Sequence, residues 1–196
     1  MNFIKTSFLS GLSTAISLIA RLISTKIVAV LLGTNGMFLM GQLKDFLRLG
    51  NTLSSFGIEN GIIKYTSEFE KKEKDLSKII GSSFKINFFG AIIFSFIIVI
   101  SREYISEFLK INFNQNFYFL VLVISIVSAS IHTWFLSIYN GLKKINLYVL
   151  VNIFSNIASA ILLIILVTKM NIIGAFYALA FNQIIALLIN ILFFAY

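Results

Sequence analysis

The 196-residue chain is 58% hydrophobic and only 12% charged, and its mean hydropathy is +0.93. Soluble domains are about 25% charged and about 45–50% apolar, and a water-soluble domain of this size has too small an interior for so many apolar side chains. The composition therefore excludes a soluble globular domain. The sequence has no cysteine, which excludes disulfides and thiolate metal sites. It also has no proline, so we expect any helix kink to occur at glycine.

The apolar residues form six runs, each long enough for a helix to cross the hydrocarbon core, which takes about 20 residues. The runs are continuous instead of short and alternating, which favours helices over a β-barrel. The predicted spans are approximately residues 6–32, 37–66, 79–100, 116–140, 146–168 and 172–196. We therefore predict an all-α integral membrane protein in which residues 1–196 form a single six-helix bundle.

The basic residues indicate how these spans are oriented. The net charge of +8 does not suggest a nucleic-acid partner, because the charges lie at the ends of the apolar runs and at a few places inside them. One side of the membrane receives most of them, namely Lys5, Lys71, Lys72, Lys74, Lys78, Lys143 and Lys144. The other side receives Arg102, Lys110 and Lys169. The positive-inside rule predicts that the first side, with both chain termini, is cytoplasmic.

The first span carries a polar stripe at helical spacing, formed by Ser10, Ser13, Thr14, Ser17, Arg21, Ser24 and Thr25. A charge near the bilayer centre costs several kcal/mol unless it faces protein or water. Arg21 lies in the middle of the stripe, which indicates a water-filled cavity. The alternative is that Arg21 ties two helices together through hydrogen bonds.

The second span has a charged face that cannot lie against lipid, formed by Lys44, Asp45, Arg48 and Glu59 among other polar residues. Lys44 and Arg48 stand one helical turn apart and repel each other. If Lys44 and Arg48 are both to remain cationic, an anion must compensate their charges, either Asp45 or a bound ligand. We predict a substrate-binding site of Arg21, Lys44, Asp45, Arg48 and Glu59. A structural ion-pair network at the membrane interface is the alternative.

The later spans carry weaker signals. His132, the sole histidine, shares a face with Ser125 and Ser128 and is a candidate for proton coupling. The alternative is that it is a hydrogen-bonded packing residue. The fifth span has an uncharged polar stripe, and the sixth has a small-residue face that favours packing over binding. These two faces consist of Asn152, Ser155, Asn156 and Ser159, and of Gly174, Ala178 and Asn182.

Sequence motifs for catalysis are missing. There is neither a paired-histidine metal motif nor a glycine-rich phosphate loop with its lysine. One histidine inside a span cannot support a Ser-His-Asp triad, and the connections are too short to hold a catalytic domain. We therefore expect neither enzymatic activity nor a metal or cofactor.

Several segments resemble Wzx-type O-antigen and enterobacterial-common-antigen flippases, which belong to the multidrug/oligosaccharidyl-lipid/polysaccharide exporter superfamily. The principal segment is KIVAVLLGTNGMFLMGQLKDFLRLGNTLSSFGIENGIIKYTSEF, residues 26–69, with its glycine turn at Gly33 and Gly36 and its Lys64-Tyr65 pair. Shorter matches begin at Ile79, Asn140 and Ile173.

The resemblance implies a fold and a substrate. Family members have two six-span lobes that face each other across a central cavity, so this chain is expected to be the first lobe. It would be either part of a longer protein or a single lobe that pairs with a partner. The implied substrate is an undecaprenyl-pyrophosphate-linked oligosaccharide, carried across the bacterial inner membrane for O-antigen or related polysaccharide synthesis.

Two other functions are compatible with the sequence. A cation-coupled drug or metabolite exporter of the same superfamily would favour an acidic cavity, whereas cations outnumber acids inside these spans. A non-transporting scaffold for envelope assembly would bury its polar stripes dry between helices.

Overall fold

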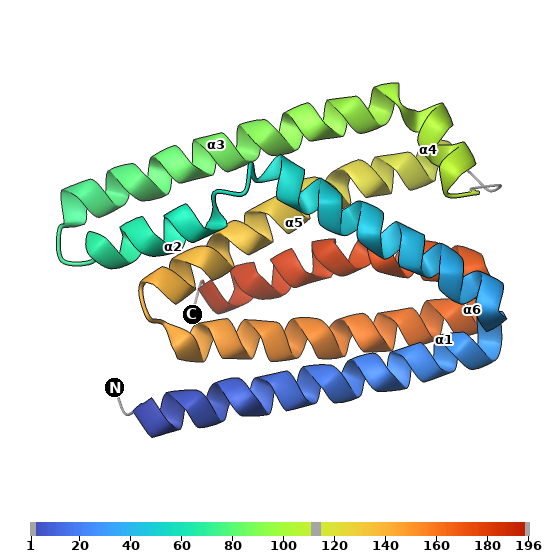
Figure 1. Ribbon diagram of the computed structural model, residues 1–196, viewed down its shortest axis with the longest axis horizontal. Helices are drawn as coiled ribbons and strands as arrows, with labels where there is room; N and C mark the ends of the chain where they lie inside the picture. Colours follow the sequence, from blue (N-terminus) through green and yellow to red (C-terminus); the bar gives the residue numbers. More distant parts are fainter. Residues whose placement is uncertain (1–2, 111–114, 195–196) are drawn as a thin grey trace.

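A computed structural model describes the backbone of residues 3–110 and 115–194, and the side chains of residues 11, 12, 14–110 and 116–194. Ser10 and Ser13 of the predicted polar stripe, and Lys5, lie outside the described side chains. The described elements are all helical, and no strand occurs among these residues. They are α1 (Phe3–Ser54), α2 (Glu59–Glu68), α3 (Glu73–Ile100), α4 (Arg102–Phe108), α5 (Gln115–Gly141) and α6 (Ile145–Phe194), shown in Figure 1.

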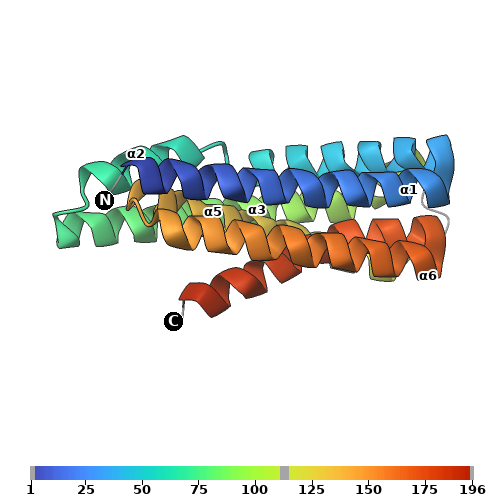
Figure 2. The ribbon, with the colours of Figure 1, turned by 90° about the horizontal axis from the view of Figure 1, so that it is seen from below.

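Helices α1 and α6 each double back on themselves, so that each is a helical hairpin with two arms (Figures 1 and 2). In α1 the reversal is at Gly33, with φ 63° and ψ −165°, between arms 3–32 and 34–54. This conformation suits glycine because it lacks a Cβ atom. In α6 the reversal is at Asn171, with φ 51° and ψ −131°, between arms 145–170 and 172–194. Glycine was expected at kinks. That prediction is right at Gly33 and wrong at Asn171, where asparagine adopts the positive φ that few other residues tolerate.

The predicted second span, residues 37–66, is interrupted. The second arm of α1 ends at Ser54, and α2 begins at Glu59. Phe56 and Gly57 between them have φ values of 50° and 64°. The adjacent helix α3 approaches closely at this break, since a Cβ atom added to Gly90 would meet the Ser54 carbonyl and the Phe56 ring. The chain continues in α2 after a local bend.

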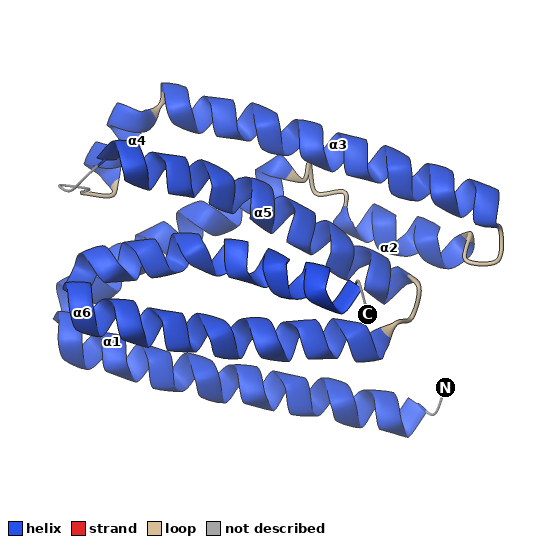
Figure 3. Ribbon diagram, turned by 180° about the vertical axis from the view of Figure 1, so that it is seen from behind, coloured by secondary structure: helices blue, strands red, loops and turns tan. Residues whose placement is uncertain are grey.

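Four of the described helices, α1, α3, α5 and α6, are long and apolar enough to cross a membrane by length and composition. Together they identify a multi-pass integral membrane protein and confirm the predicted all-α class. Helix α5 lies between α3 and the α6 hairpin (Figure 3). It supplies much of the buried core, including Tyr118, Leu122 and Ile126, which pack with Leu43 of α1 and Phe176 of α6.

The lysine-containing connections lie together at one end of the bundle. The beginning of α1, the end of α6 and the connections α2–α3 and α5–α6 lie at one end (Figure 1). This end therefore carries Lys71, Lys72, Lys143 and Lys144. The reversals at Gly33 and Asn171 lie at the opposite end. The grouping of the basic connections that the sequence predicts is thus present in the fold.

Candidate functional site

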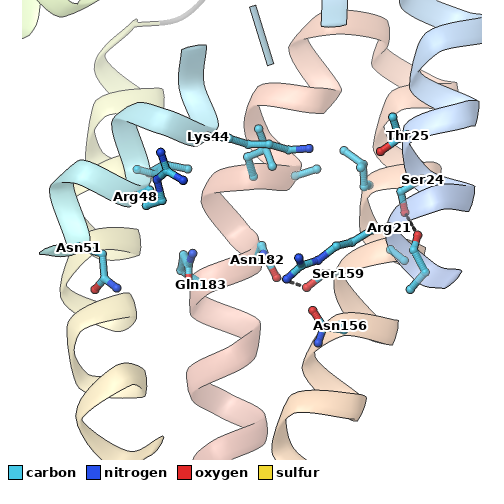
Figure 4. A pocket seen from close by; sticks show the side chains of 16 residues that line it. Arg21, Ser24, Thr25, Lys44, Arg48, Asn51, Asn156, Ser159, Asn182 and Gln183 are labelled. Atoms are coloured by element: carbon cyan, nitrogen blue, oxygen red, sulfur yellow. Dashed lines mark hydrogen bonds between the residues drawn. The ribbon is translucent and has the colours of Figure 1, made fainter. Parts of the chain in front are cut away.

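A cavity of about 510 Å³ opens between the two helical hairpins (Figure 4). All four arms contribute to its wall. Its lining residues are Ala20, Arg21, Ser24, Thr25, Lys44, Leu47, Arg48, Asn51, Asn156, Ser159, Ala160, Leu163, Ala178, Leu179, Asn182 and Gln183. Ten of these side chains are polar or charged, so the cavity can hold a hydrated group inside an otherwise apolar bundle.

The register of the two hairpins explains why these polar residues meet. Arg21 precedes the Gly33 reversal by 12 residues, and Lys44 follows it by 11. Ser159 precedes Asn171 by 12 residues, and Asn182 follows it by 11. At 1.5 Å per residue, all four lie about 17 Å from the tip of their hairpin, which is about half of the roughly 30 Å hydrocarbon thickness. Arg21, Lys44, Ser159 and Asn182 therefore lie at about the same level, near the middle of the bundle.

Three of the five predicted substrate-binding residues, Arg21, Lys44 and Arg48, line this cavity. Figure 4 shows Arg21 reaching from the first arm of α1 toward Ser159 and Asn182 of α6. None of the described lining residues is acidic. The electrostatic character of the cavity is therefore cationic, and it suits an anion.

Asp45 is the counter-charge of Arg48 but does not line the cavity. Its Oδ1 atom lies 3.3 Å from Nη2 of Arg48, and the two side chains are 68% and 78% exposed. An exposed pair of this kind contributes at most about 1 kcal/mol. The pair can therefore open when another anion approaches Arg48.

Uncharged polar groups complete the wall. The Ser159 hydroxyl donates to Asn182 Oδ1 across the α6 hairpin (Figure 4). Asn156 Nδ2 donates to the Ser17 hydroxyl at 2.8 Å and links α6 to α1. Asn156 and Ser159 were noticed in the sequence only as an uncharged stripe, and Asn182 was assigned to packing. The nearly equal spacing of Ser159 and Asn182 from the reversal at Asn171 was the signal that could have placed these two residues in the site.

Glu59 and His132 are not brought into the cavity. Glu59 lies in the first turn of α2, beyond the helix break. His132 Nδ1 lies 3.2 Å from Asn190 Nδ2, and Asn190 Oδ1 accepts a hydrogen bond of 2.8 Å from the Tyr139 hydroxyl. This geometry favours the packing interpretation of His132 over the coupling one.

Within the described parts of the chain, no group of three His, Cys, Asp or Glu side chains is arranged to hold a metal ion. The chemistry that the site offers is therefore binding through cations, amides and hydroxyls. No carboxylate among the described lining residues is placed to act as an acid or base in the cavity.

Comparison with known proteins reveals a distant similarity to two flippases. The chain is 28% identical over 83 residues to the lipid III flippase of Escherichia coli K12, and equally to that of Shigella flexneri. The aligned segment covers 42% of this chain and only 20% of each relative. No protein-family model and no solved structure matches. Both relatives are transport proteins by name, and the similarity extends over less than half of this chain.

Proposed function

We propose that the chain is one lobe of a flippase that moves a lipid-linked oligosaccharide across the bacterial inner membrane for O-antigen or related polysaccharide synthesis. The observation that carries the proposal is the cavity, where Arg21, Lys44 and Arg48 meet without a lining carboxylate. The similarity to lipid III flippases supports the transport of a lipid precursor. The oligosaccharide pyrophosphate as the substrate is what the resemblance to Wzx-type flippases implies, and the basic and amide side chains that line the cavity are compatible with it.

The lobe has six spans in this proposal. They are the two arms of α1, with α2 extending the second arm, then α3, α5 and the two arms of α6. The lysine-rich end of the bundle faces the cytoplasm because basic connections are retained on that side. Both termini then lie in the cytoplasm, and the reversals at Gly33 and Asn171 lie at the periplasmic face.

A pyrophosphate linked to a sugar is anionic and heavily hydrated. Moving it through hydrocarbon alone would carry the large cost of burying an unpaired charge. Arg21 and Arg48 can each hold two phosphate oxygens in a bidentate contact. The amides of Asn156, Asn182 and Gln183 line the same cavity and can replace water around the sugar. The cavity thus offers partners for both parts of the head group.

The other functions fit this cavity less well. An exporter of cationic drugs needs acidic groups to compensate its substrate, whereas the charged lining residues are basic. A scaffold protein would enclose its polar stripes between helices. Here Arg21, Lys44 and Arg48 are exposed on the open side of the cavity, which leaves room for a second six-helix lobe to form the opposite wall.

The test is to replace the cavity cations in the full-length protein and to measure polysaccharide export and membrane abundance together. Each arginine makes charge-assisted hydrogen bonds worth about 1.5–3 kcal/mol, so we expect Arg21→Ala or Arg48→Ala to lower export by about tenfold or more at normal abundance. Arg48→Lys should retain part of the activity, because the charge remains while the bidentate geometry is lost. Lys26→Ala is the matched control, since Lys26 is an exposed cation of α1 outside the cavity.

Two results would contradict the proposal. Normal export by the Arg21→Ala and Arg48→Ala double variant would exclude the site. A fall in membrane abundance that accounts for all the lost export would assign these arginines to structure instead of substrate binding.

A further inference from the structure

Helix α3, at one edge of the bundle (Figure 1), carries a lysine inside its membrane-spanning part. Lys85 lies six residues after Ile79, where the predicted span 79–100 begins, which is about 9 Å along the helix. An ionisable side chain at such a depth almost always faces the bundle interior or a water-filled cavity. Lys85 is exposed and does not line the polar cavity. Its charge therefore needs a partner from outside the bundle.

The register of α3 shows that Lys85 is on the outer face of the helix. Asn87, two residues further on and about 200° around the helix, is buried and donates to the Ser130 carbonyl of α5 at 3.0 Å. Apolar side chains continue the face of Lys85 at spacings of four, seven and eleven residues. They are Phe89, Ile92 and Phe96, which are 63%, 47% and 67% exposed. Since such a face lies against lipid in a membrane, Lys85 belongs to the lipid-facing surface.

The chain itself supplies no counter-charge for Lys85. Among the described side chains no acid forms an ion pair with it, and Asp75 of the same helix pairs with Lys78, with 3.7 Å between Oδ1 and Nζ. Side chains of a helix lean toward its N-terminus, which for α3 is the lysine-rich end of the bundle (Figure 1). Lys85 therefore leans over Gly81 and Ser82. A Cβ atom added to Gly81 would meet no other element within 4 Å, so the surface there is open.

We infer that Lys85, Ser82 and Gly81 form a binding site for the head group of an anionic phospholipid. The phosphate accepts hydrogen bonds from the Lys85 ammonium and the Ser82 hydroxyl, and Gly81 leaves room for it. The lipid belongs to the leaflet at the lysine-rich end of the bundle, which is the cytoplasmic leaflet in the orientation of the proposed function. The site does not otherwise depend on transport.

A lipid phosphate is the anion that a lysine in this position meets. The apolar stem of lysine lies along the helix surface while its ammonium reaches the head groups. A zwitterionic head group carries its own ammonium, which competes with Lys85 for the phosphate. A phosphatidylglycerol head group has a phosphodiester and hydroxyls but no cation. Its negative charge is therefore left for Lys85 to compensate, which favours the anionic lipid.

The test measures lipid binding to the purified, delipidated full-length protein by native mass spectrometry. Phosphatidylglycerol and phosphatidylethanolamine with the same acyl chains are titrated separately. We expect Lys85→Ala to lower the affinity for phosphatidylglycerol about fivefold, which corresponds to about 1 kcal/mol for one lysine at an anionic membrane surface. The affinity for phosphatidylethanolamine should stay the same. Lys144→Ala is the matched control, because it removes an exposed lysine from the α5–α6 connection at the same end of the bundle, and it should change neither affinity.

A second variant distinguishes a defined site from a general attraction between charges. Gly81→Leu keeps every charge and fills the open surface beside Lys85. We expect it to lower the affinity for phosphatidylglycerol by a similar factor while the protein stays folded, since the added side chain meets no other element close to its Cβ atom. Gly11→Leu is the matched control. Gly11 is an exposed glycine near the start of α1, with equally open surroundings, and its substitution should have no effect.

Two results would overturn the inference. An equal loss of affinity in Lys85→Ala and Lys144→Ala, with none in Gly81→Leu, would mean that overall charge attracts the lipid. Unchanged phosphatidylglycerol binding in both Lys85→Ala and Gly81→Leu would assign Lys85 to another partner, such as a carboxylate of a second protein. Neither result bears on the proposed function, because Lys85 lies outside the polar cavity and that function is tested by export in the cavity variants.

Discussion

Asn190 of the second arm of α6 contacts Tyr139 and His132 of α5. These contacts allow the free-energy cost of losing a buried polar contact to be predicted. Asn190 is fully buried and Tyr139 is 2% exposed. Tyr139→Phe removes the hydroxyl that donates to Asn190 Oδ1 at 2.8 Å. Hydrogen bonds between membrane helices average about 0.6 kcal/mol and reach about 1.7 kcal/mol. Because the substitution leaves an oxygen of a fully buried side chain without this donor, we expect Tyr139→Phe to lower the free energy of unfolding by about 1–2 kcal/mol.

A double-mutant cycle isolates this contact. Asn190→Leu also removes the contact with His132 Nδ1, so it should cost more, about 2–3 kcal/mol. In the double variant Tyr139→Phe/Asn190→Leu, neither partner is left unpaired. We expect its cost to fall short of the sum of the single costs by about 1 kcal/mol.

The assay is reversible unfolding of the purified protein in mixed detergent–lipid micelles, with the free energy of unfolding extrapolated to zero denaturant. Tyr104→Phe is the control, since Tyr104 of α4 is 80% exposed and should tolerate the change. Additive costs for Tyr139→Phe and Asn190→Leu, within about 0.3 kcal/mol, would refute the reasoning. The same contact bears on transport, because a His132→Asn variant should still export if His132 is a packing residue, and should not if it relays protons.

Three further predictions concern the hairpins and the lobe. A positive φ strains a residue that has a Cβ atom. Asn171→Gly should therefore raise the free energy of unfolding by about 1 kcal/mol, and Gly33→Ala should lower it by about 1–3 kcal/mol. Changes of the opposite sign in the unfolding assay would be inconsistent with these reversals. Reporter fusions at Lys74 and Lys143 should be cytoplasmic and one at Lys169 periplasmic, and a periplasmic reporter at Lys74 would reverse the orientation. The chain reconstituted as a monomer should not flip a labelled lipid-linked sugar, since in the proposed transporter a second lobe forms the opposite wall of the cavity. Activity from a proven monomer would exclude the half-transporter proposal.

The sequence predicts the membrane class and part of the site because both depend on the cost of placing charge in hydrocarbon. Arg21, Lys44 and Arg48 stand out inside apolar runs, and they meet in the cavity. Glu59 carries the same kind of signal but lies beyond the break after Ser54, in α2. A prediction that extends one helical face from residue 37 to residue 66 misses this break, because Phe56 and Gly57 adopt left-handed backbone conformations.

Other features depend on tertiary contacts that leave no periodic signal. The reversal of α6 lies in the predicted connection between residues 168 and 172, but the residue that adopts the positive φ there is Asn171 instead of a glycine. Asn182 looks like a packing residue until the reversal places it level with Ser159. Trp134 had no assigned role in the sequence. In the structure its indole Nε1 donates to the buried Ser83 hydroxyl at 3.0 Å and joins α5 to α3. Such pairs are separated by tens of residues, so local spacing cannot reveal them.

The depth of Arg21 and Lys44 in the bundle has an electrical consequence. Moving one elementary charge across a membrane at 100 mV involves about 2.3 kcal/mol. Arg21 and Lys44 lie about 17 Å from the hairpin tip, so an anion bound there has passed through about half of the field. In the proposed orientation, a resting potential that is negative inside therefore does about half of its work during binding and half during release, about 1.2 kcal/mol per charge in each step. The affinity for an anionic lipid presented from the cytoplasmic side should accordingly increase with voltage, which binding measurements in vesicles with an imposed potassium gradient can quantify.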